Sequence, residues 1–309
     1  MTITTDKPRK TARSSKPRRD VGQTNLPTNE RGELDMIAVL LEALTVPGRL
    51  SQCYNRFHRY SFLNIVLVYM QTGKLEPMGT FKKWQSLGRN VISGPGSALF
   101  VNHPRFVPVR DGAGNPVKDE KGRAKQKFVG SVPRPTVFQL FQTDGPELSL
   151  PTMPAWDREQ AMEALDITPQ KFSHSDGNTQ GYSAGREFAI NPVAEQPFKT
   201  MIHEWAHILL GHTEDSEEYH NHRGVKEFQA EAVALLVCTE LDVDGYDPAT
   251  SRGYIQNWLR GDSSEYVDTD GNLLVDNKAV RQVFSVADAI MTAGRIKHYD
   301  KLAETTTRQ

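Results

Sequence analysis

The feature that most limits how this chain can fold is the segment MIHEWAHILLG at residues 201–211, where two histidines and a glutamate interrupt an otherwise apolar stretch. Apolar residues at this spacing predict a helix that packs into a core. Burying His203, Glu204 and His207 without partners would cost several kcal/mol, so the fold must supply partners for them. A bound metal ion removes that cost, and the segment therefore predicts a metal site.

The spacing of these residues indicates which metal chemistry to expect. His203 and His207 are four residues apart, so a helix places them on one face, about 6 Å apart along its axis. Two imidazoles in this arrangement can reach one Zn²⁺ at roughly 2.0–2.1 Å each. Glu204 points about 100° away around the helix, where it can remain outside the ligand set and take a proton from a water molecule. The pattern is typical of a zinc peptidase, although a zinc-bound helix pair can also be purely structural.

A His₂Glu site of the gluzincin type needs one carboxylate from a second helix, and VKEFQAEAVALLV at 225–237 offers two. We expect Glu231 to be the third ligand because it lies deeper in the apolar stretch. Glu227 would then hydrogen-bond a ligating histidine, and the reverse assignment stays open. His212 does not fit the longer pattern H-E-x-x-H-x-x-G-x-x-H, because Leu210 and Thr213 occupy its glycine and final histidine positions.

Charge divides the chain into two unequal halves. Residues 1–149 hold 23 Lys/Arg against 12 Asp/Glu, whereas residues 150–309 hold 14 against 26. The first half therefore suits a polyanionic partner and the second does not. Residues 1–30 are basic and almost devoid of apolar side chains, which predicts a flexible tail.

The alternation of apolar periods and turn signals predicts an α+β protein with two domains. We expect the tail at 1–30, a mixed domain at 31–149 and a mostly helical domain with a small sheet at 150–309. The first domain should contain a hairpin with a polar tip at 110–127, and the second a hairpin with an edge strand at 181–192. Helices are expected at 34–44, 54–69, around Trp84, and at 157–166, 199–212, 225–241, 250–260 and 278–298.

Composition also bears on the compartment. The longest strongly apolar run, FLNIVLVYM at 62–70, is about half of what a bilayer crossing requires, so we expect no membrane partner. Cys53 and Cys238 are each flanked by apolar residues, which favours buried free thiols in a reducing compartment. No secretory signal is evident, so we expect a cytoplasmic protein.

Several segments in order resemble the ArdC-type antirestriction proteins of plasmids, from about residue 35 to 295. The segments are YSFLNIVLV, FKKWQSLGRNVISGPGSALFV, VFQLFQTDG, HEWAHILLGH, EFQAEAVALLV and YIQNWL. The resemblance implies a domain that binds single-stranded DNA, fused to a zincin metallopeptidase domain related to the ImmA/IrrE peptidases. It also implies protection of incoming conjugative DNA from restriction, with Glu204 as catalytic base and Tyr254 as a candidate transition-state donor.

The first half contains the residue types that hold single strands, namely cations for the phosphates and aromatic faces for the bases. The candidate DNA-binding residues are Arg56, Arg59, Lys82, Lys83, Trp84 and Arg89. Aromatic residues more often fill a core, and the basic residues at 118–127 fit a solvated hairpin as well as a strand-wrapping one. Zn²⁺ is the expected cofactor, with Mn²⁺ as an alternative. Two other functions stay open: a regulatory peptidase that cleaves a DNA-bound repressor, and a DNA-dependent protease with a protein substrate.

Overall fold

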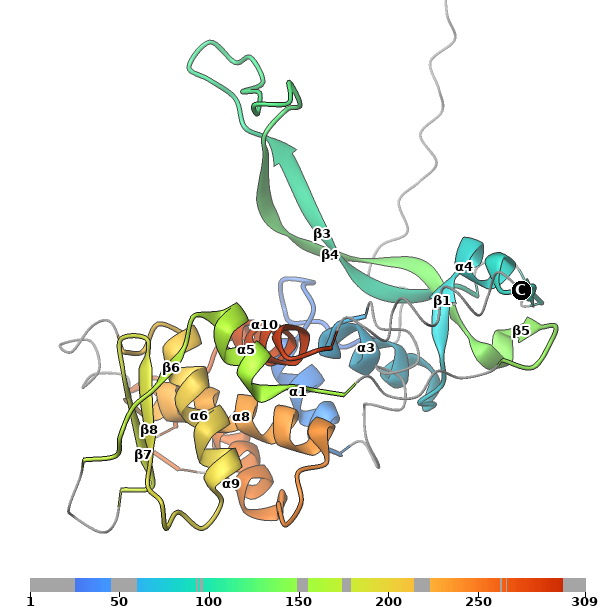
Figure 1. Ribbon diagram of the computed structural model, residues 1–309. Coiled ribbons are helices and arrows are strands. Elements are labelled where there is room, and N and C mark those ends of the chain that lie inside the picture. Colours follow the sequence, from blue (N-terminus) through green and yellow to red (C-terminus); the bar gives the residue numbers. More distant parts are fainter. Residues whose placement is uncertain are drawn as a thin grey trace, which may run out of the picture.

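The computed structural model describes residues 26–45, 60–92, 94, 97–148, 155–173, 179–213, 223–261, 263–264 and 266–296. Helices and small sheets alternate along these residues, so the chain is an α+β protein, as the sequence predicts. Most of the helices gather in one part of the molecule, a short helix lies apart beside the first-half strands, and a two-stranded arm projects away from the helices (Figure 1).

Two helices of the first half belong to the helical part of the molecule. They are α1 (Met36–Thr45) and α3 (Phe62–Thr72). The side chain of Ser61 caps α3 by accepting the Asn64 N–H, and α3 ends at Gly73, whose φ of 66° favours glycine. These two helices bury apolar faces rich in Val, Ile and Leu.

Both helices are tied to α10 (Asn277–Ala293), near the other end of the described chain. The Met36 N–H donates to Asn277 Oδ1 at 2.9 Å, and the Phe62 N–H donates to Asp288 Oδ1 at 2.9 Å. Buried residues on both sides of residue 150, where the sequence predicts a domain boundary, form one continuous hydrophobic cluster. The first half therefore contributes to the same core as the second.

The sheets of the first half are antiparallel. One has the order β1-β4-β3, from β1 (Met78–Thr80), β4 (Gln126–Gln139) and β3 (Leu99–Pro108). A second pairs β2 (Asn90–Val91) with β5 (Thr143–Asp144). The short helices α4 (Phe81–Ser86) and η2 (Leu140–Gln142) lie between these strands in the sequence.

In the second half a three-stranded sheet precedes the helices that carry the candidate site. Its order is β6-β8-β7, so β7 (Gly181–Ala184) is an edge strand beside β8 (Glu187–Ile190), and β6 (Thr168–Pro169) pairs with β8 on the other side. This confirms the predicted hairpin with an edge strand. The helices of this half are α5 (Arg158–Leu165), α6 (Pro197–Leu209), α8 (Arg223–Leu241), α9 (Ala249–Arg260) and α10.

The structure bears on two further predictions, the absence of a membrane span and the burial of the cysteines. Within the described residues, no helix is long and apolar enough to cross a membrane. Cys238 is a buried free thiol as predicted, and burial raises its pKa to about 12. Cys53 lies outside the described residues, as does most of the predicted basic tail.

Candidate metal centre

The two predicted histidines lie on α6, and their side chains converge. Pro197 starts the helix, and buried side chains such as Met201, Ile202 and Trp205 anchor it in the core. The Nε2 atoms of His203 and His207 lie 3.1 Å apart, and their ring centroids lie 4.9 Å apart. The i, i+4 spacing therefore produces the convergence that the sequence predicts.

A carboxylate from α8 completes the cluster, and it belongs to Glu227. Its two oxygens lie 3.4 Å from His203 Nε2 and 3.7 Å from His207 Nε2. One ligand atom from each of the three side chains lies within 4.8 Å of the others. Ligands held at 2.0–2.1 Å in a tetrahedral site are about 3.3 Å apart, so the three side chains fit a divalent metal ion. We expected Glu231 in this position, and the structure brings Glu227 there instead.

Glu231 lies one helical turn further along α8 and contacts the opposite side of the His203 ring. Its Oε2 is 3.1 Å from His203 Nδ1 and 2.7 Å from Lys199 Nζ, while the Ser251 hydroxyl donates to Oε1. A carboxylate on the outer nitrogen of a ligating histidine fixes the ring's tautomer and orientation. Glu231 is therefore placed for the supporting role that the sequence suggested for Glu227.

The second histidine has an outer partner of its own. His207 Nδ1 lies 3.0 Å from His212 Nδ1, and His212 Nε2 lies 3.2 Å from Gln229 Oε1. Gln229 Nε2 donates to the Ala279 carbonyl of α10 at 3.1 Å. One assignment of protons satisfies every link, with His207 Nδ1 donating to His212 and His212 Nε2 donating to Gln229. It leaves His207 Nε2 with a free lone pair that faces the cluster.

The pKa values in the cluster follow from these contacts. Burial alone would lower the pKa of His203, but its hydrogen bonds to Glu227 and Glu231 raise it to about 9. Burial alone would raise the pKa of Glu227, but its hydrogen bonds to the imidazoles of His203 and His207 hold that pKa well below its usual range. Burial, and then the neighbouring His207, lower the pKa of His212 to about 4. The cluster thus attracts positive charge, and His212 remains a neutral imidazole at pH 7.

The side chain of Glu204 is held by the small sheet. It is buried, and Ser183 Oγ of edge strand β7 donates to Glu204 Oε2 at 2.7 Å. The strand lies close to the helix because Gly181 has no side chain, since a Cβ there would be 2.8 Å from Thr200 Cγ2 of α6. Glu204 is absent from the group of side chains whose atoms could hold a metal ion.

Tyr254, the weakest of the predicted catalytic residues, lies on α9. Its ring packs edge-on against Trp258, with the centroids 6.5 Å apart. Burial raises the pKa of Tyr254, and the negative charges of Glu227 and Glu231 add to the effect. The hydroxyl is therefore within electrostatic reach of the cluster and stays protonated at neutral pH.

Two predicted DNA-binding residues have structural roles instead. Trp84 is completely buried and donates its indole N–H to the Phe138 carbonyl at 2.9 Å, so it cannot stack on a base. Arg89 is also buried, and its guanidinium donates to Thr143, Gly145 and Pro146. Lys82 and Lys83 are exposed on α4, as a phosphate contact requires. Arg56 and Arg59 lie outside the described residues.

Three residues that contact the cluster or Glu204 were not predicted from the sequence, namely Ser183, Lys199 and Ser251. Lys199 could have been found, because it precedes His203 by four residues and so shares its helical face. Ser183 could be placed only on a predicted edge strand, and Ser251 only on a predicted helix. The packing of separate elements brings both hydroxyls to the site, and no local pattern reports it.

Comparison with protein families bears on the first half of the chain. Residues 42–138 match the N-terminal domain of anti-restriction factor ArdC. The match includes α3, the strands of the β1-β4-β3 sheet and the arm. No curated protein matches the chain.

Two solved structures of the antirestriction ArdC protein from plasmid R388 are similar to the chain. The metal-free structure is 19% identical, with 90% of this chain and 93% of that chain covered at a TM-score of 0.42. The Mn(II)-bound structure is 20% identical, with 87% and 96% covered at a TM-score of 0.38.

Proposed function

We propose that this protein is a cytoplasmic antirestriction protein of the ArdC type, with single-stranded-DNA binding in its first half and a zinc peptidase centre in its second. The observation that carries the peptidase proposal is the convergence of His203, His207 and Glu227 beside a separately held Glu204. The family match of residues 42–138 supports the antirestriction role.

In this proposal His203, His207 and Glu227 hold the metal ion. Two imidazoles and a carboxylate suit Zn²⁺, and Mn²⁺ is compatible with the same donors. When bound, such an ion polarises a peptide carbonyl and makes a water molecule easier to deprotonate. Glu231 and His212 keep the two imidazole rings in orientation from their outer nitrogens.

The remaining steps belong to the protein's own groups. Glu204 accepts a proton from the attacking water and returns it to the leaving amine. The Ser183 hydroxyl holds one oxygen of Glu204 and leaves the other available for that proton. Edge strand β7 offers backbone hydrogen bonds to an extended peptide, which would align a protein substrate beside the cluster.

The first half supports the DNA-binding part of the proposal. It carries the positive excess of the chain, and the exposed Lys82 and Lys83 lie within the matched domain. Cations of this kind contact phosphates and make the affinity fall with salt.

Conjugation provides the decisive assay. A plasmid that encodes this protein is transferred into otherwise identical recipients with and without a restriction system, and the ratio of transfer frequencies is measured. We expect the wild-type protein to raise the ratio towards one. A ratio equal to that of a plasmid lacking the gene would contradict the antirestriction role.

A Glu204→Gln variant then separates the mechanisms. If the protein protects DNA by covering it, the variant should protect as well as the wild type. If it acts as a regulatory peptidase or a DNA-dependent protease, protection should be lost while the metal ion is retained. Dependence of cleavage on added single strands distinguishes the DNA-dependent protease from the regulatory peptidase.

A further inference from the structure

Strands β3 and β4 continue beyond the first-half sheet as an arm that projects from the molecule (Figure 1). The arm, which we define as residues 99–139, is paired from Leu99↔Val137 to Pro108↔Gln126, with register shifts between Leu99 and Phe100 and between Pro104 and Phe106. Strand β1 pairs with β4 only at the base of the arm, from Met78↔Gln139 to Thr80↔Val137. Most of the arm is therefore a ribbon two strands wide, with both faces open to solvent.

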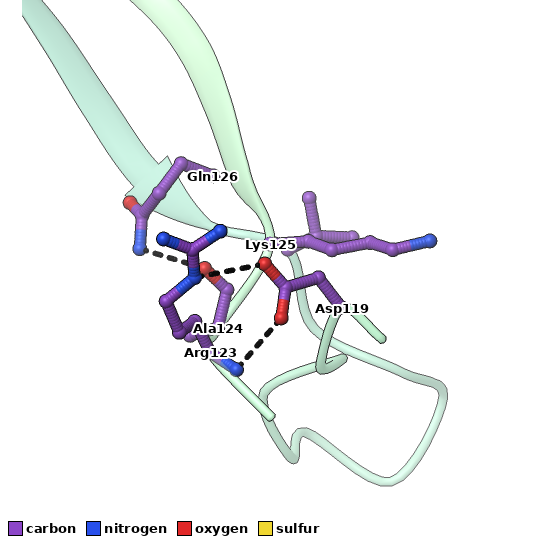
Figure 2. Close-up of a pocket in the computed structure, with 6 residues that line it drawn as sticks. Asp119, Arg123, Ala124, Lys125 and Gln126 are labelled. Atoms are coloured by element: carbon purple, nitrogen blue, oxygen red, sulfur yellow. Dashed lines mark hydrogen bonds and ion pairs between the residues drawn. The ribbon is translucent and has the colours of Figure 1, made fainter. Parts of the chain in front are cut away.

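The tip of the arm is an ordered structure. Two successive turns begin at Asp111 and Asp119, and each aspartate accepts N–H bonds from the second and fourth residues that follow it. Backbone bonds also join Val109, Val117 and Lys125 where the turns meet the strands. An open pocket at the tip is lined by Val109, Asp119, Arg123, Ala124, Lys125 and Gln126 (Figure 2). A tip built this way presents its side chains in fixed directions.

An aromatic pair lies midway along the arm. Phe106 and Phe128 are directly opposite in the register, with ring centroids 5.8 Å apart and an interplanar angle of 63°. They are 55% and 57% exposed, and the adjacent Val107 and Val129 are 39% and 44% exposed. Four of the nine large apolar side chains exposed among the described residues are thus gathered on one short stretch of ribbon. Exposed apolar side chains gathered in this way mark an interaction site.

The charge of the arm indicates the partner. Residues 99–139 contain eight Lys/Arg and three Asp/Glu. Two of the three acids, Asp111 and Asp119, close the turns at the tip, and Asp119 also pairs with Arg123 at 3.1 Å. Lys125 and Lys127 are exposed, and Lys125 extends away from the Asp119–Arg123 pair (Figure 2). Exposed aromatic rings on a ribbon with a positive excess suit a ligand with both flat apolar faces and negative charges.

We propose that this arm is the surface that binds single-stranded nucleic acid, with bases stacked on Phe106 and Phe128 and phosphates contacting Lys125 and Lys127. A single strand exposes base faces that a duplex hides, and stacking on aromatic side chains is indifferent to sequence. The two lysines are two residues apart and lie on one face, opposite to the face of Phe106 and Phe128, and on so narrow a ribbon their long side chains reach its edges. This inference rests on the proposed DNA-binding function and assigns DNA binding to the arm.

The experiment measures the affinity of the full chain for a fluorescein-labelled 20-nucleotide oligothymidylate by anisotropy, across a salt series. Phe106→Ala/Phe128→Ala should weaken binding roughly tenfold or more per stacked base and leave the salt dependence unchanged. Lys125→Ala/Lys127→Ala should reduce the slope of log K against log salt by about 1.4, because each phosphate contact on a single strand contributes about 0.7. All four side chains are exposed, so the variants should fold normally.

Matched variants distinguish stacking from other uses of the arm. Phe106→Leu/Phe128→Leu keeps an apolar patch and removes the aromatic faces, so it should bind as weakly as the alanine variant, whereas the double tyrosine variant should retain affinity. Phe141→Ala removes a phenylalanine of similar exposure, 46%, outside the arm, and Lys171→Ala/Lys278→Ala removes two exposed lysines of the second half. Both of these controls should bind like the wild type.

The outcomes separate this inference from the proposed function. If the wild type binds the oligonucleotide and the arm variants bind equally well, the arm is not the strand-binding surface, and the DNA-binding function stands. If the wild type does not bind, the DNA-binding function itself fails. If the arm variants change only the oligomeric mass measured by light scattering, a second copy of the chain occupies the arm and the inference is overturned.

Discussion

Ser183 Oγ lies 2.7 Å from Glu204 Oε2, so the edge strand of the small sheet is hydrogen-bonded directly to the Glu204 carboxylate of helix α6. The strand that would align a peptide is therefore hydrogen-bonded to the carboxylate that would deprotonate water. Gly181, two residues earlier, allows this approach, because a larger residue would meet Thr200 of α6.

Replacing Ser183 by alanine should slow peptide hydrolysis without removing the metal ion. The variant leaves one oxygen of a buried carboxylate without its donor and lets the Glu204 side chain rotate, which should lower kcat by roughly tenfold. Cleavage of fluorescently labelled casein and metal content are measured together. Ser183→Thr, which keeps the hydroxyl, should recover most of the rate, and equal rates for the alanine variant and the wild type would exclude the positioning role.

Replacing His212 by alanine should weaken metal binding while leaving all three ligands in place. The change removes the acceptor for His207 Nδ1, and loss of such an outer partner typically costs 10–100-fold in metal affinity. Competition with a chromophoric zinc chelator measures the affinity. His103→Ala, which removes a histidine of the β3 strand, should leave it unchanged, and an unchanged affinity in His212→Ala would contradict the supporting role of His212.

The junction between α3 and α10 should make stability depend on pH. Burial raises the pKa of Asp288 to about 7, although the Phe62 N–H and the charge of Arg295 act in the opposite direction. An aspartate in the unfolded chain titrates near 3.9, so between pH 4 and 7 the folded state binds more protons than the unfolded state. The contribution of Asp288 to the free energy of unfolding should therefore fall as pH rises through this window, by at most about 4 kcal/mol.

Asp288→Asn isolates this contribution. The amide oxygen can still accept the Phe62 N–H, and the side chain carries no charge to desolvate. Urea denaturation at pH 5 and pH 8 should show that the variant is more stable than the wild type at pH 8, with a smaller difference at pH 5. A wild type that gains stability from pH 5 to 8 by as much as the variant would show that Asp288 is not the responsible group.

Local patterns predicted the helices and the histidine pair, because both depend on spacing within one element. The i, i+4 separation of His203 and His207 determines their convergence whatever the rest of the chain does. The choice between Glu227 and Glu231 could not be predicted in this way. Both lie on the same face of α8, and the position of α8 along α6 decides which one reaches the Nε2 atoms.

Depth in the apolar stretch also does not indicate which carboxylate lies nearest the Nε2 atoms. The more deeply placed Glu231 is compensated by Lys199 and Ser251, so it does not need a metal ion to be buried. The aromatic residues of the first half illustrate the same limit. Trp84 is flanked by lysines but faces the core, whereas the exposed pair Phe106 and Phe128 is brought together only by the register of two distant strands.

The central claim, that His203, His207 and Glu227 form a metal centre supported by Glu231, is tested most directly by zinc titration of two matched variants. Isothermal titration calorimetry of Glu227→Gln and Glu231→Gln compares the same substitution one helical turn apart. We predict that Glu227→Gln loses stoichiometric zinc binding, whereas Glu231→Gln binds one zinc ion per chain with 10–100-fold lower affinity. One tightly bound zinc ion in Glu227→Gln, with none in Glu231→Gln, would contradict the assignment.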